Sequence, residues 1–522
     1  MAVDNRYWLE LPPRRRFLDY STVGVAAVAM WAAFPYIEAY VLAYPALALL
    51  VSVVDRSRVW RGTWYAFVFG LIFFLLHIWW ATISVGSYLP WFALAFIQAL
   101  FLGLWGWIVG VIRSIEIIHR SPFAYAMAIA LAWVGIEQLR GTIPFGGFPW
   151  GYIAYSQVDA PVGKLAPWGS EIVIGFAVVA AAVLFRRTFS LVPAHATGNW
   201  WSRPLALVLG ITALVAPAAI DLPAASQEGT VRVGIIQGNI EQPVNDTYRT
   251  PLKVTRNHAN TTLRALEEGM KADLIIWGEN SLDQDPRSSR EARTILSDAV
   301  NRAGVPFIVG VIRYDDRYRY NDMITWYPDG QTRQSYTKQK PVPFGEYIPF
   351  RQYLSILSKE TAKVSVDMLP GTGPGIIDVT LDNDRTLRTA VGICFEAAYE
   401  EVFATGVRLG GQIIVVPTNN SSFGYAPEAA QQLQMVRLRA MSLSRSAMQV
   451  STNGVSAIIR PNGTMRSTTG LFESAWRVED VPIRTQITFS ARFGDAMTIG
   501  TYLLLGALVF VSAVSTIRKR SL

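Results

Sequence analysis

The stretch Thr389–Glu396, TAVGICFE in one-letter code, is an apolar run that ends at Cys394, the single cysteine among 522 residues. Valine, isoleucine and threonine favour strands, so the run predicts a strand that delivers a thiol to a sharp turn at the edge of a sheet. No disulfide can form within a chain that has one cysteine. Because free cysteine is among the most buried residue types, a buried small apolar side chain is the alternative interpretation of Cys394.

Composition divides the chain into apolar and soluble segments. Hydrophobic residues make up 51% of the chain and charged residues 16%, whereas a soluble domain carries about 25% charged residues. The apolar excess precedes residue 222 and returns near the C-terminus. We therefore expect a membrane domain over residues 1–222, a soluble domain over 223–495, and a final span with a basic tail over 496–522.

Apolar runs of near-spanning length, which is about 20 residues, indicate an α-helical membrane bundle. About eight spans are predicted, seven of them in the first domain, and an even number places both termini on one side. The runs cover residues 20–36, 38–54, 63–84, 88–112, 122–139, 171–185, 204–222 and 498–516.

Basic residues cluster on one side of these predicted spans. The clusters are Arg14–Arg16, Arg56 with Arg58 and Arg61, Arg113 with Arg120, Arg186 and Arg187 with Arg203, and Arg518–Arg520. The loops on the other side carry Lys164 alone. By the positive-inside rule the clustered side is cytoplasmic, so residues 223–495 are expected to be extracytoplasmic. The net charge of +8 thus indicates membrane topology, and no nucleic-acid partner is expected.

The soluble segment alternates short apolar strands with helical stretches, which predicts an α/β sandwich. The predicted strands are Val231–Gln237, Asp273–Trp277, Pro306–Arg313, Met323–Trp326, Leu387–Ile393, Gln412–Pro417 and Met448–Ile459. The predicted helices are Leu252–Lys271, Arg290–Ala303 and Glu428–Ser444.

Three strand ends or following loops carry reactive groups: Glu279, Lys338 and Cys394. A thiol needs a base or a nearby cation to react as thiolate. Histidine is the usual base, but three of the four histidines lie in or beside the apolar region, and His258 lies mid-helix. A carboxylate base with a lysine is chemically adequate, with Glu279 taking the thiol proton and Lys338 stabilising thiolate and oxyanion. Taken singly, Glu279 could be an acid near a helix N-terminus and Lys338 a solvated loop lysine.

Together these segments resemble the nitrilase superfamily and, within it, the apolipoprotein N-acyltransferases. The motifs that carry the resemblance in the soluble segment are Gln237–Ile240, Lys338 with Pro341–Pro349, Gly392–Glu396, Gln432–Ala440 and Thr452–Ala457. Those in the membrane segment are Glu137 with Arg140, Gly147–Trp150, and Tyr155 with Gln157.

The resemblance implies an α-β-β-α sandwich and a Glu279–Lys338–Cys394 catalytic triad, with Glu279 as general base, Lys338 as the oxyanion-stabilising cation and Cys394 as nucleophile. Glu346, Glu396 and Phe395 are implied as supporting residues, the two glutamates positioning the site rather than carrying protons. The implied reaction moves an acyl chain from a phospholipid, through a Cys394 thioester, to the N-terminal diacylglyceryl-cysteine of an apolipoprotein. Such a two-step transfer predicts ping-pong kinetics.

No metal or cofactor is required by this chemistry. The resemblance places the chain in a bacterial cytoplasmic (inner) membrane as a multi-pass protein, and a monomer is expected. The phospholipid donor and the diacylated apolipoprotein acceptor are its expected partners, and a polyprenol-phosphate mannose synthase is a further candidate partner.

Three positions depart from the family pattern. Gly278 stands where proline is usual, Ser421–Gly424 lacks a common tryptophan, and Gln432 replaces a frequent histidine. These departures leave acceptor recognition open. Two other functions also remain open: a membrane-tethered amidase that uses the same triad, and a non-catalytic homologue that binds lipoproteins.

Overall fold

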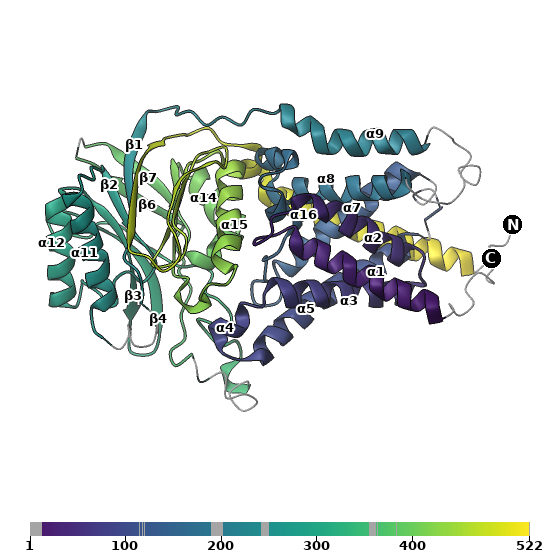
Figure 1. Ribbon diagram of the computed structural model, residues 1–522, viewed down its shortest axis with the longest axis horizontal. Helices are drawn as coiled ribbons and strands as arrows, with labels where there is room; N and C mark the ends of the chain where they lie inside the picture. Colours follow the sequence, from purple (N-terminus) through teal and green to yellow (C-terminus); the bar gives the residue numbers. More distant parts are fainter. Residues whose placement is uncertain are drawn as a thin grey trace.

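The computed structural model describes residues 13–113, 115–116, 118, 121–188, 202–241, 250–353, 362, 364–382 and 384–520. A helical part and an α/β part lie end to end along the long axis of the molecule (Figure 1). The first turn of α1 and the last turn of α16 lie at the end of the helical part remote from the sheets.

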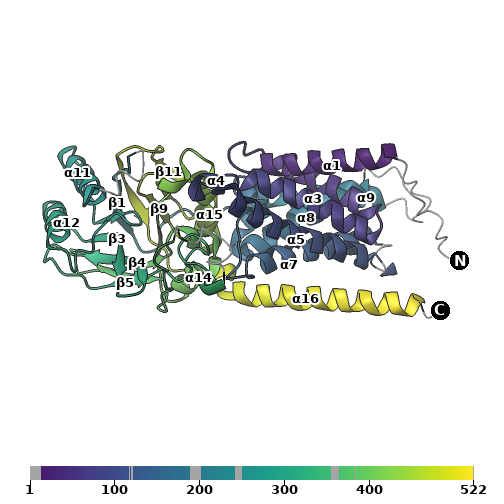
Figure 2. The same ribbon diagram turned by 90° about the horizontal axis from the view of Figure 1, so that it is seen from below.

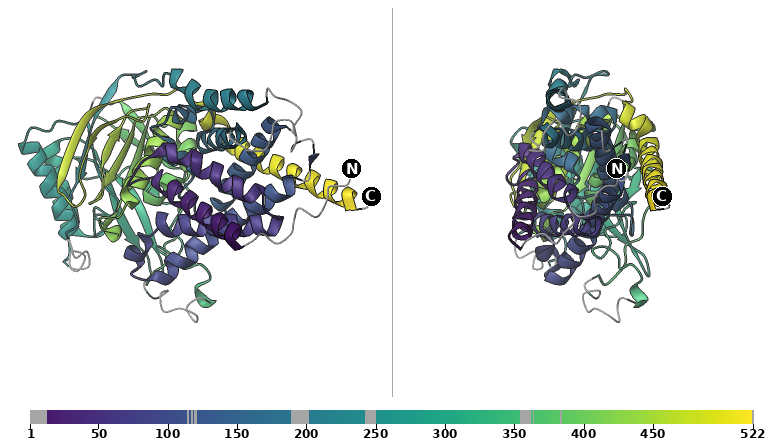
Figure 3. Two further views of the ribbon diagram at one scale, coloured as in Figure 1. Left: turned by 45° about the vertical axis from the view of Figure 1, so that its right-hand side comes forward. Right: turned by 90° about the vertical axis from the view of Figure 1, so that its right-hand side faces the viewer.

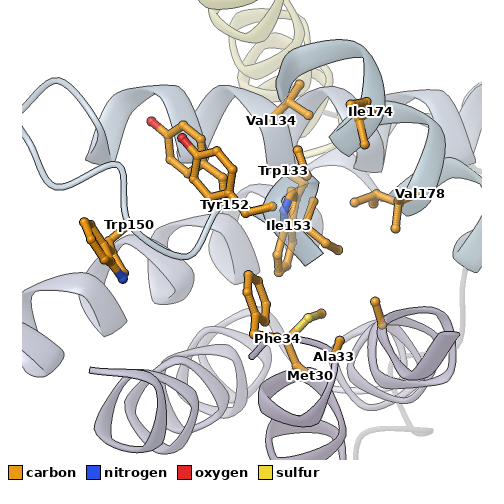
Figure 4. Close-up of a cluster of buried hydrophobic side chains, with 14 of the residues drawn as sticks. Met30, Ala33, Phe34, Trp133, Val134, Trp150, Tyr152, Ile153, Ile174 and Val178 are labelled. Carbon is orange, nitrogen blue, oxygen red and sulfur yellow. The ribbon is translucent and has the colours of Figure 1, made fainter. Parts of the chain in front are cut away.

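The helical part is a bundle around a buried apolar core. Its α-helices are α1 (Pro13–Ala32), α2 (Ala43–Asp55), α3 (Val59–His77), α4 (Ala81–Val85), α5 (Tyr88–Ile112), α7 (Pro122–Arg140), α8 (Ser170–Thr188), α9 (Ser202–Val215) and α16 (Phe489–Arg520). The short helices η3 (Ile153–Gln157) and η4 (Pro161–Trp168) lie between α7 and α8. In the core, Met30 and Phe34 lie close to Trp133 and Ile153 (Figure 4).

Four of the described helices are long and apolar enough to cross a membrane: α3, α5, α7 and residues 489–515 of α16. The predicted count of about eight spans is therefore not confirmed. The α2 and α9 regions are apolar but shorter. α16 runs along the outside of the bundle (Figures 2 and 3), and its apolar side chains such as Leu503 and Phe510 are exposed.

Three of the predicted basic clusters meet at one end of the bundle. Arg186 pairs with Asp55 at the end of α2, and Arg113 donates to the carbonyl oxygen of Ser57 at 2.8 Å. Arg56 pairs with Asp19 of α1 at 2.5 Å. Segments far apart in the sequence thus bring their positive charges to the same end.

The α/β part contains two six-stranded sheets, each of mixed strand direction. The first has the order β12-β1-β2-β3-β4-β5 and consists of β1 (Thr230–Gln237), β2 (Leu274–Trp277), β3 (Phe307–Tyr314), β4 (Arg319–Trp326), β5 (Ser335–Thr337) and β12 (Ala475–Pro482). The second has the order β11-β10-β9-β8-β7-β6 and consists of β6 (Ile376–Thr380), β7 (Thr386–Val391), β8 (Ile413–Thr418), β9 (Ala447–Ser451), β10 (Ala457–Ile459) and β11 (Met465–Thr468).

Helices cover both outer faces, so the predicted α-β-β-α order is confirmed (Figure 1). α11 (Lys253–Glu267) and α12 (Arg290–Ala303) cover the first sheet, and α14 (Glu400–Arg408) and α15 (Glu428–Leu443) lie between the second sheet and the bundle. Central strands are buried on both faces: Ile235 of β1 belongs to the core between the sheets, and Ile236 to the core under α11 and α12. Because both faces of these strands are buried, their sequences are continuous apolar runs instead of alternating apolar and polar residues.

One predicted strand is wrong. Met448–Ile459 forms two antiparallel strands, β9 and β10, in which Ala457 pairs with Gln449. The intervening Thr452–Ser456 contains Asn453 and Gly454, and asparagine and glycine favour turns because they accept left-handed backbone or bond to it locally.

Candidate active site

Each of the three predicted catalytic residues lies at or just beyond the end of a strand. Glu279 is two residues past β2, Lys338 follows β5 directly, and Cys394 is three residues past β7. β2 and β5 belong to one sheet and β7 to the other. The site therefore forms where the two sheets of the sandwich face each other.

Cys394 occupies the sharp turn that its sequence predicts. Its φ is +52°, in the left-handed region that non-glycine residues seldom adopt and that recurs at functional sites. It begins the short helix η8 (Cys394–Ala398) and remains partly exposed, whereas its neighbours Ile393 and Phe395 are buried. The turn thus presents the sulfur while the flanking side chains anchor the loop.

Lys338 lies between two carboxylates. Its Nζ is 2.8 Å from Glu346 Oε1 and 3.4 Å from Glu279 Oε1. Asn321 of β4 donates to the same Glu279 oxygen at 2.6 Å. Lys338 is fully buried, Glu279 is 3% exposed and the Glu346 side chain is 17% exposed, so the ammonium and its two partners form a largely desolvated charge cluster.

Burial and charge set the protonation of this cluster. Burial raises the pKa of the Cys394 thiol and the charge of Glu279 raises it further, while the Lys338 ammonium opposes both. Burial also raises the pKa of Glu279, against the effect of Lys338. Burial acts to lower the pKa of Lys338, but Glu346 and Glu279 outweigh it and raise that pKa. The resting site therefore holds a protonated thiol beside a charged lysine.

Glu396 joins the lysine loop to the cysteine loop. Its Oε1 accepts from the backbone N–H groups of Gln339 (2.7 Å) and Lys340 (3.0 Å), and its Oε2 from that of Ile393 (2.6 Å). The Tyr336 hydroxyl lies 2.9 Å from both oxygens. All of these neighbours are donors, so the geometry fits a positioning role for Glu396.

Phe395 connects the cysteine loop to the helical bundle. Its ring stacks on Phe148 and Trp150 with centroid distances of 6.1 and 6.3 Å. The Tyr399 hydroxyl, at the end of the same loop, donates to the carbonyl oxygen of Gly147 at 3.1 Å. Arg140 of α7 supports this contact by donating to the carbonyl oxygen of Trp150 at 2.8 Å. The Gly147–Trp150 motif of the bundle therefore packs directly against the loop of the cysteine.

A buried arginine strengthens the same junction. Arg439 of α15 pairs with Glu171 of α8 and donates through Nε to the carbonyl oxygen of Ala397 at 3.0 Å. Tyr155 donates to the carbonyl oxygen of Ala398 at 3.2 Å. Helices of the bundle and of the α/β part thus hold the backbone that follows the nucleophile.

Several polar neighbours of the site are not among the residues that the sequence predicts. They include Asn321 beside Glu279 and a buried group on the sulfur side: Thr418, Asn420, Glu428, Gln432 and Ser451. Asn321 and Asp322 lie side by side in a strand that is otherwise apolar near its end. Paired polar residues in such a strand are the signal by which Asn321 could have been found. In the sequence, Gln432 opens the Gln432–Ala440 motif and is itself a departure from the family pattern.

Metal ligation has no basis in the described part of the chain, where no group of three or more His, Cys, Asp or Glu side chains could hold an ion. The reactive groups of the candidate site are the thiol, the ammonium and the carboxylates described above. Their arrangement can carry out nucleophilic acyl transfer.

Comparison with known proteins yields matches in both parts of the chain. Residues 26–184 match the family model for the apolipoprotein N-acyltransferase N-terminal domain, and residues 232–484 match that for carbon-nitrogen hydrolase. The apolipoprotein N-acyltransferase of Mycolicibacterium smegmatis is 31% identical, covering 93% of this chain and 84% of the relative. That of Pseudomonas putida is 27% identical, covering 92% and 94%. Among solved structures, an amidase from Nesterenkonia sp. aligns with 54% of this chain and all of its own, at 16% identity and a TM-score of 0.37.

Proposed function

Because this chain belongs to the apolipoprotein N-acyltransferase family, we propose that it transfers an acyl chain from a phospholipid to the α-amino group of a lipoprotein's N-terminal diacylglyceryl-cysteine. The chain is an acyltransferase enzyme; the phospholipid donor, the thioester intermediate and the roles of individual residues are the proposal. The observation that carries it is the desolvated cluster in which the Lys338 ammonium bridges Glu279 and Glu346 beside the Cys394 thiol.

In the first half-reaction the Cys394 sulfur attacks the carbonyl carbon of the phospholipid ester while Glu279 takes the thiol proton. Lys338 stabilises the oxyanion of the tetrahedral intermediate. The carbon–oxygen ester bond then breaks, the leaving oxygen takes the proton from Glu279, and an acyl-thioester and a lysophospholipid result. The raised pKa of the thiol supports a mechanism in which the proton leaves during the attack rather than before it.

In the second half-reaction the neutral α-amine of the acceptor attacks the thioester carbonyl. Glu279 takes a proton from the amine, and the carbon–sulfur bond breaks to give an amide. The departing thiolate recovers the proton from Glu279, which returns the enzyme to its starting state. Water must be excluded while the thioester waits, and the packing of Phe395 on Phe148 and Trp150 supports a site closed by apolar side chains on the bundle side.

We further propose that the chain spans the cytoplasmic membrane of a bacterium with its α/β part outside. The convergence of Arg56, Arg113 and Arg186 on the end of α2 supports a cytoplasmic position for that end. The sheets lie at the opposite end of the molecule (Figure 1), where lipid and lipoprotein of the outer leaflet would meet the site.

The test uses the purified full-length protein in phospholipid vesicles. Intact-mass analysis should show one long-chain acyl group added to the protein, and the adduct should be released by hydroxylamine, as a thioester is. Since Cys394 is the only cysteine, such an adduct identifies the nucleophile. Adding a synthetic diacylated lipopeptide should discharge the adduct and give a triacylated product. Cys394→Ala should abolish the adduct, and Glu279→Gln and Lys338→Met should each form it far more slowly than the wild type.

The alternatives give different results. Release of ammonia from small amides with no acyl adduct would establish the amidase and overturn the proposal. Full lipopeptide acylation by Cys394→Ala would exclude a thioester mechanism.

A further inference from the structure

The side-chain amide of Gln432 faces the reactive sulfur. Gln432 is fully buried on α15, and its Nε2 is 3.7 Å from Cys394 Sγ, a distance suited to an N–H group that donates to sulfur. An amide side chain can be placed with its oxygen and nitrogen exchanged, so its neighbours must decide which atom faces the sulfur.

The neighbours of Gln432 allow one orientation. The backbone N–H groups of Gly454 and Asn453 both donate to Ser451 Oγ, at 2.7 and 3.4 Å. Because these bonds occupy both lone pairs of that oxygen, the Ser451 hydroxyl acts as the donor to Asn420 Oδ1, 2.8 Å away. The nitrogen of the Asn420 amide therefore faces Gln432 Oε1 at 3.0 Å. Because the Gln432 oxygen accepts this bond, its nitrogen points to the sulfur of Cys394.

Two further contacts stabilise this arrangement. Thr418 Oγ1 donates to the same Gln432 oxygen at 2.9 Å, and Asn420 Nδ2 also donates to Glu428 Oε2 at 2.8 Å. Thr418, Asn420, Glu428 and Gln432 are all buried. A connected, buried network of this kind fixes the direction of each amide far more firmly than one hydrogen bond would.

An uncharged hydrogen-bond donor can stabilise the Cys394 thiolate in a way that the charged groups around the thiol do not. Glu279 and Glu428 oppose the formation of a thiolate, whereas Lys338 and a hydrogen bond with Thr418 favour it. The Lys338 ammonium is already shared between Glu279 and Glu346. An N–H donor at the sulfur stabilises negative charge there without adding another ion to the buried cluster.

We propose that Gln432 is a catalytic residue whose amide donates a hydrogen bond to the Cys394 sulfur and stabilises the thiolate as it forms in attack and as it leaves the thioester. The inference rests on the proposed function for its place in acyl transfer, but the hydrogen bond acts on any electrophile that reacts with Cys394. Asn420, Thr418 and Glu428 are positioning residues that orient the amide.

The test measures the reactivity of the thiol without any lipid substrate. Iodoacetamide can alkylate only one cysteine in this chain, so intact mass follows Cys394 directly in the full-length protein in detergent. Rates are measured from pH 6 to pH 10. Gln432→Met, which has similar volume and no N–H donor, should react about tenfold more slowly at pH 7.5, with its pH profile moved up by about one unit.

Two further variants complete the experiment. Gln432→His restores an N–H donor and should return the alkylation rate to within about threefold of the wild type. If the role of Gln432 were purely structural, the Gln432→His and Gln432→Met variants would react at similar rates. Gln434→Leu removes an amide from the same helix that contacts Glu38 instead of the sulfur, and its pH profile should match the wild type.

Equal rates and pH profiles for Gln432→Met, Gln432→His and the wild type would overturn the inference. If Gln432→Met melts well below the wild type, the comparison rests on Gln432→Asn, which keeps the amide but is one methylene shorter; wild-type reactivity in that variant would also overturn it. The proposed function can fail separately. If the variants show the expected alkylation profiles but the wild type forms no acyl adduct from phospholipid, phospholipid is refuted as the acyl donor and the role of Gln432 is unaffected.

Discussion

Replacing Glu396 by glutamine tests whether this buried carboxylate positions the site by joining two loops. The carboxylate accepts three backbone N–H groups, two on Oε1 from the lysine loop and one on Oε2 from Ile393. A glutamine has one carbonyl oxygen. If that oxygen stays with the lysine loop, its NH₂ group meets the Ile393 N–H donor, which loses its acceptor.

The free-energy cost of Glu396→Gln follows from replacing one carboxylate oxygen by an NH₂ group. One hydrogen bond to a charged group is lost and one buried donor is left unpaired, which costs about 2–3 kcal/mol. The Tyr336 hydroxyl can turn to accept from the new NH₂ group, so it adds little. If the whole of this free energy is lost from the positioning of the two loops in the transition state, the rate of Cys394 acylation should drop roughly 30- to 160-fold.

The assay compares acylation of Cys394 by phospholipid with thermal unfolding of the same preparation. The matched control is Glu401→Gln, because Glu401 pairs with Lys340 of the same loop at 3.4 Å but its side chain is 48% exposed. An exposed pair is worth about 1 kcal/mol or less, so this control should stay within about fivefold of the wild type. Acylation by Glu396→Gln within twofold of the wild type would refute the positioning role, and a lower melting temperature with unchanged acylation would show a structural role alone.

Three other substitutions follow from the same geometry. Lys338→Met leaves Glu279 and Glu346 facing each other without a cation and should slow thioester formation at least about 100-fold, as measured by single-turnover intact mass. Burial raises the pKa of Glu428 to about 8, against the hydrogen bond from Asn420, from an ordinary value of 4.5. The folded state then binds the proton more tightly than the unfolded state, so this contribution to stability is complete below pH 4.5 and is lost as the pH rises to about 8. The melting temperature of Glu428→Gln should therefore exceed that of the wild type by a margin that grows over this range and then stays constant; a margin independent of pH would contradict the argument. Arg439→Met leaves Glu171 buried without its partner and should lower the free energy of unfolding by about 3–5 kcal/mol. Adding Glu171→Leu should recover part of this loss, because both buried charges are then removed. Equal melting temperatures of the single and double variants would count against the pairing.

Strands β1 to β4, β7 and β8 could be predicted from contiguous apolar runs, whereas β5, β6, β11 and β12 were not among the predicted strands. The candidate catalytic residues could be named because each lies at a strand end or in the loop that follows. The run before Cys394 is apolar and β-branched, and its side chains are buried between the sheets. Dependence on contiguous apolar runs also explains the error at Met448–Ile459. Two short strands of one sheet, both rich in apolar residues, follow each other there, and only the turn at Asn453 and Gly454 separates them. Helix counts were less predictable, because helices such as α2 are apolar but shorter than a span.

What the sequence by itself determined is an α/β sandwich, the clustering of positive charge, and the choice of Cys394, Glu279 and Lys338 as candidates, since each follows from residue types within short stretches. The α-β-β-α order was implied by the family resemblance. Only the tertiary structure decided that Glu396 ties the lysine loop to the cysteine loop, that Phe395 stacks on Trp150 of the bundle, and that the amide of Gln432 points at the sulfur. Those contacts join segments tens to hundreds of residues apart. The physical reason is that a hydrogen bond or a ring contact depends on distance and direction in space and on exclusion from water, which the packed fold alone supplies.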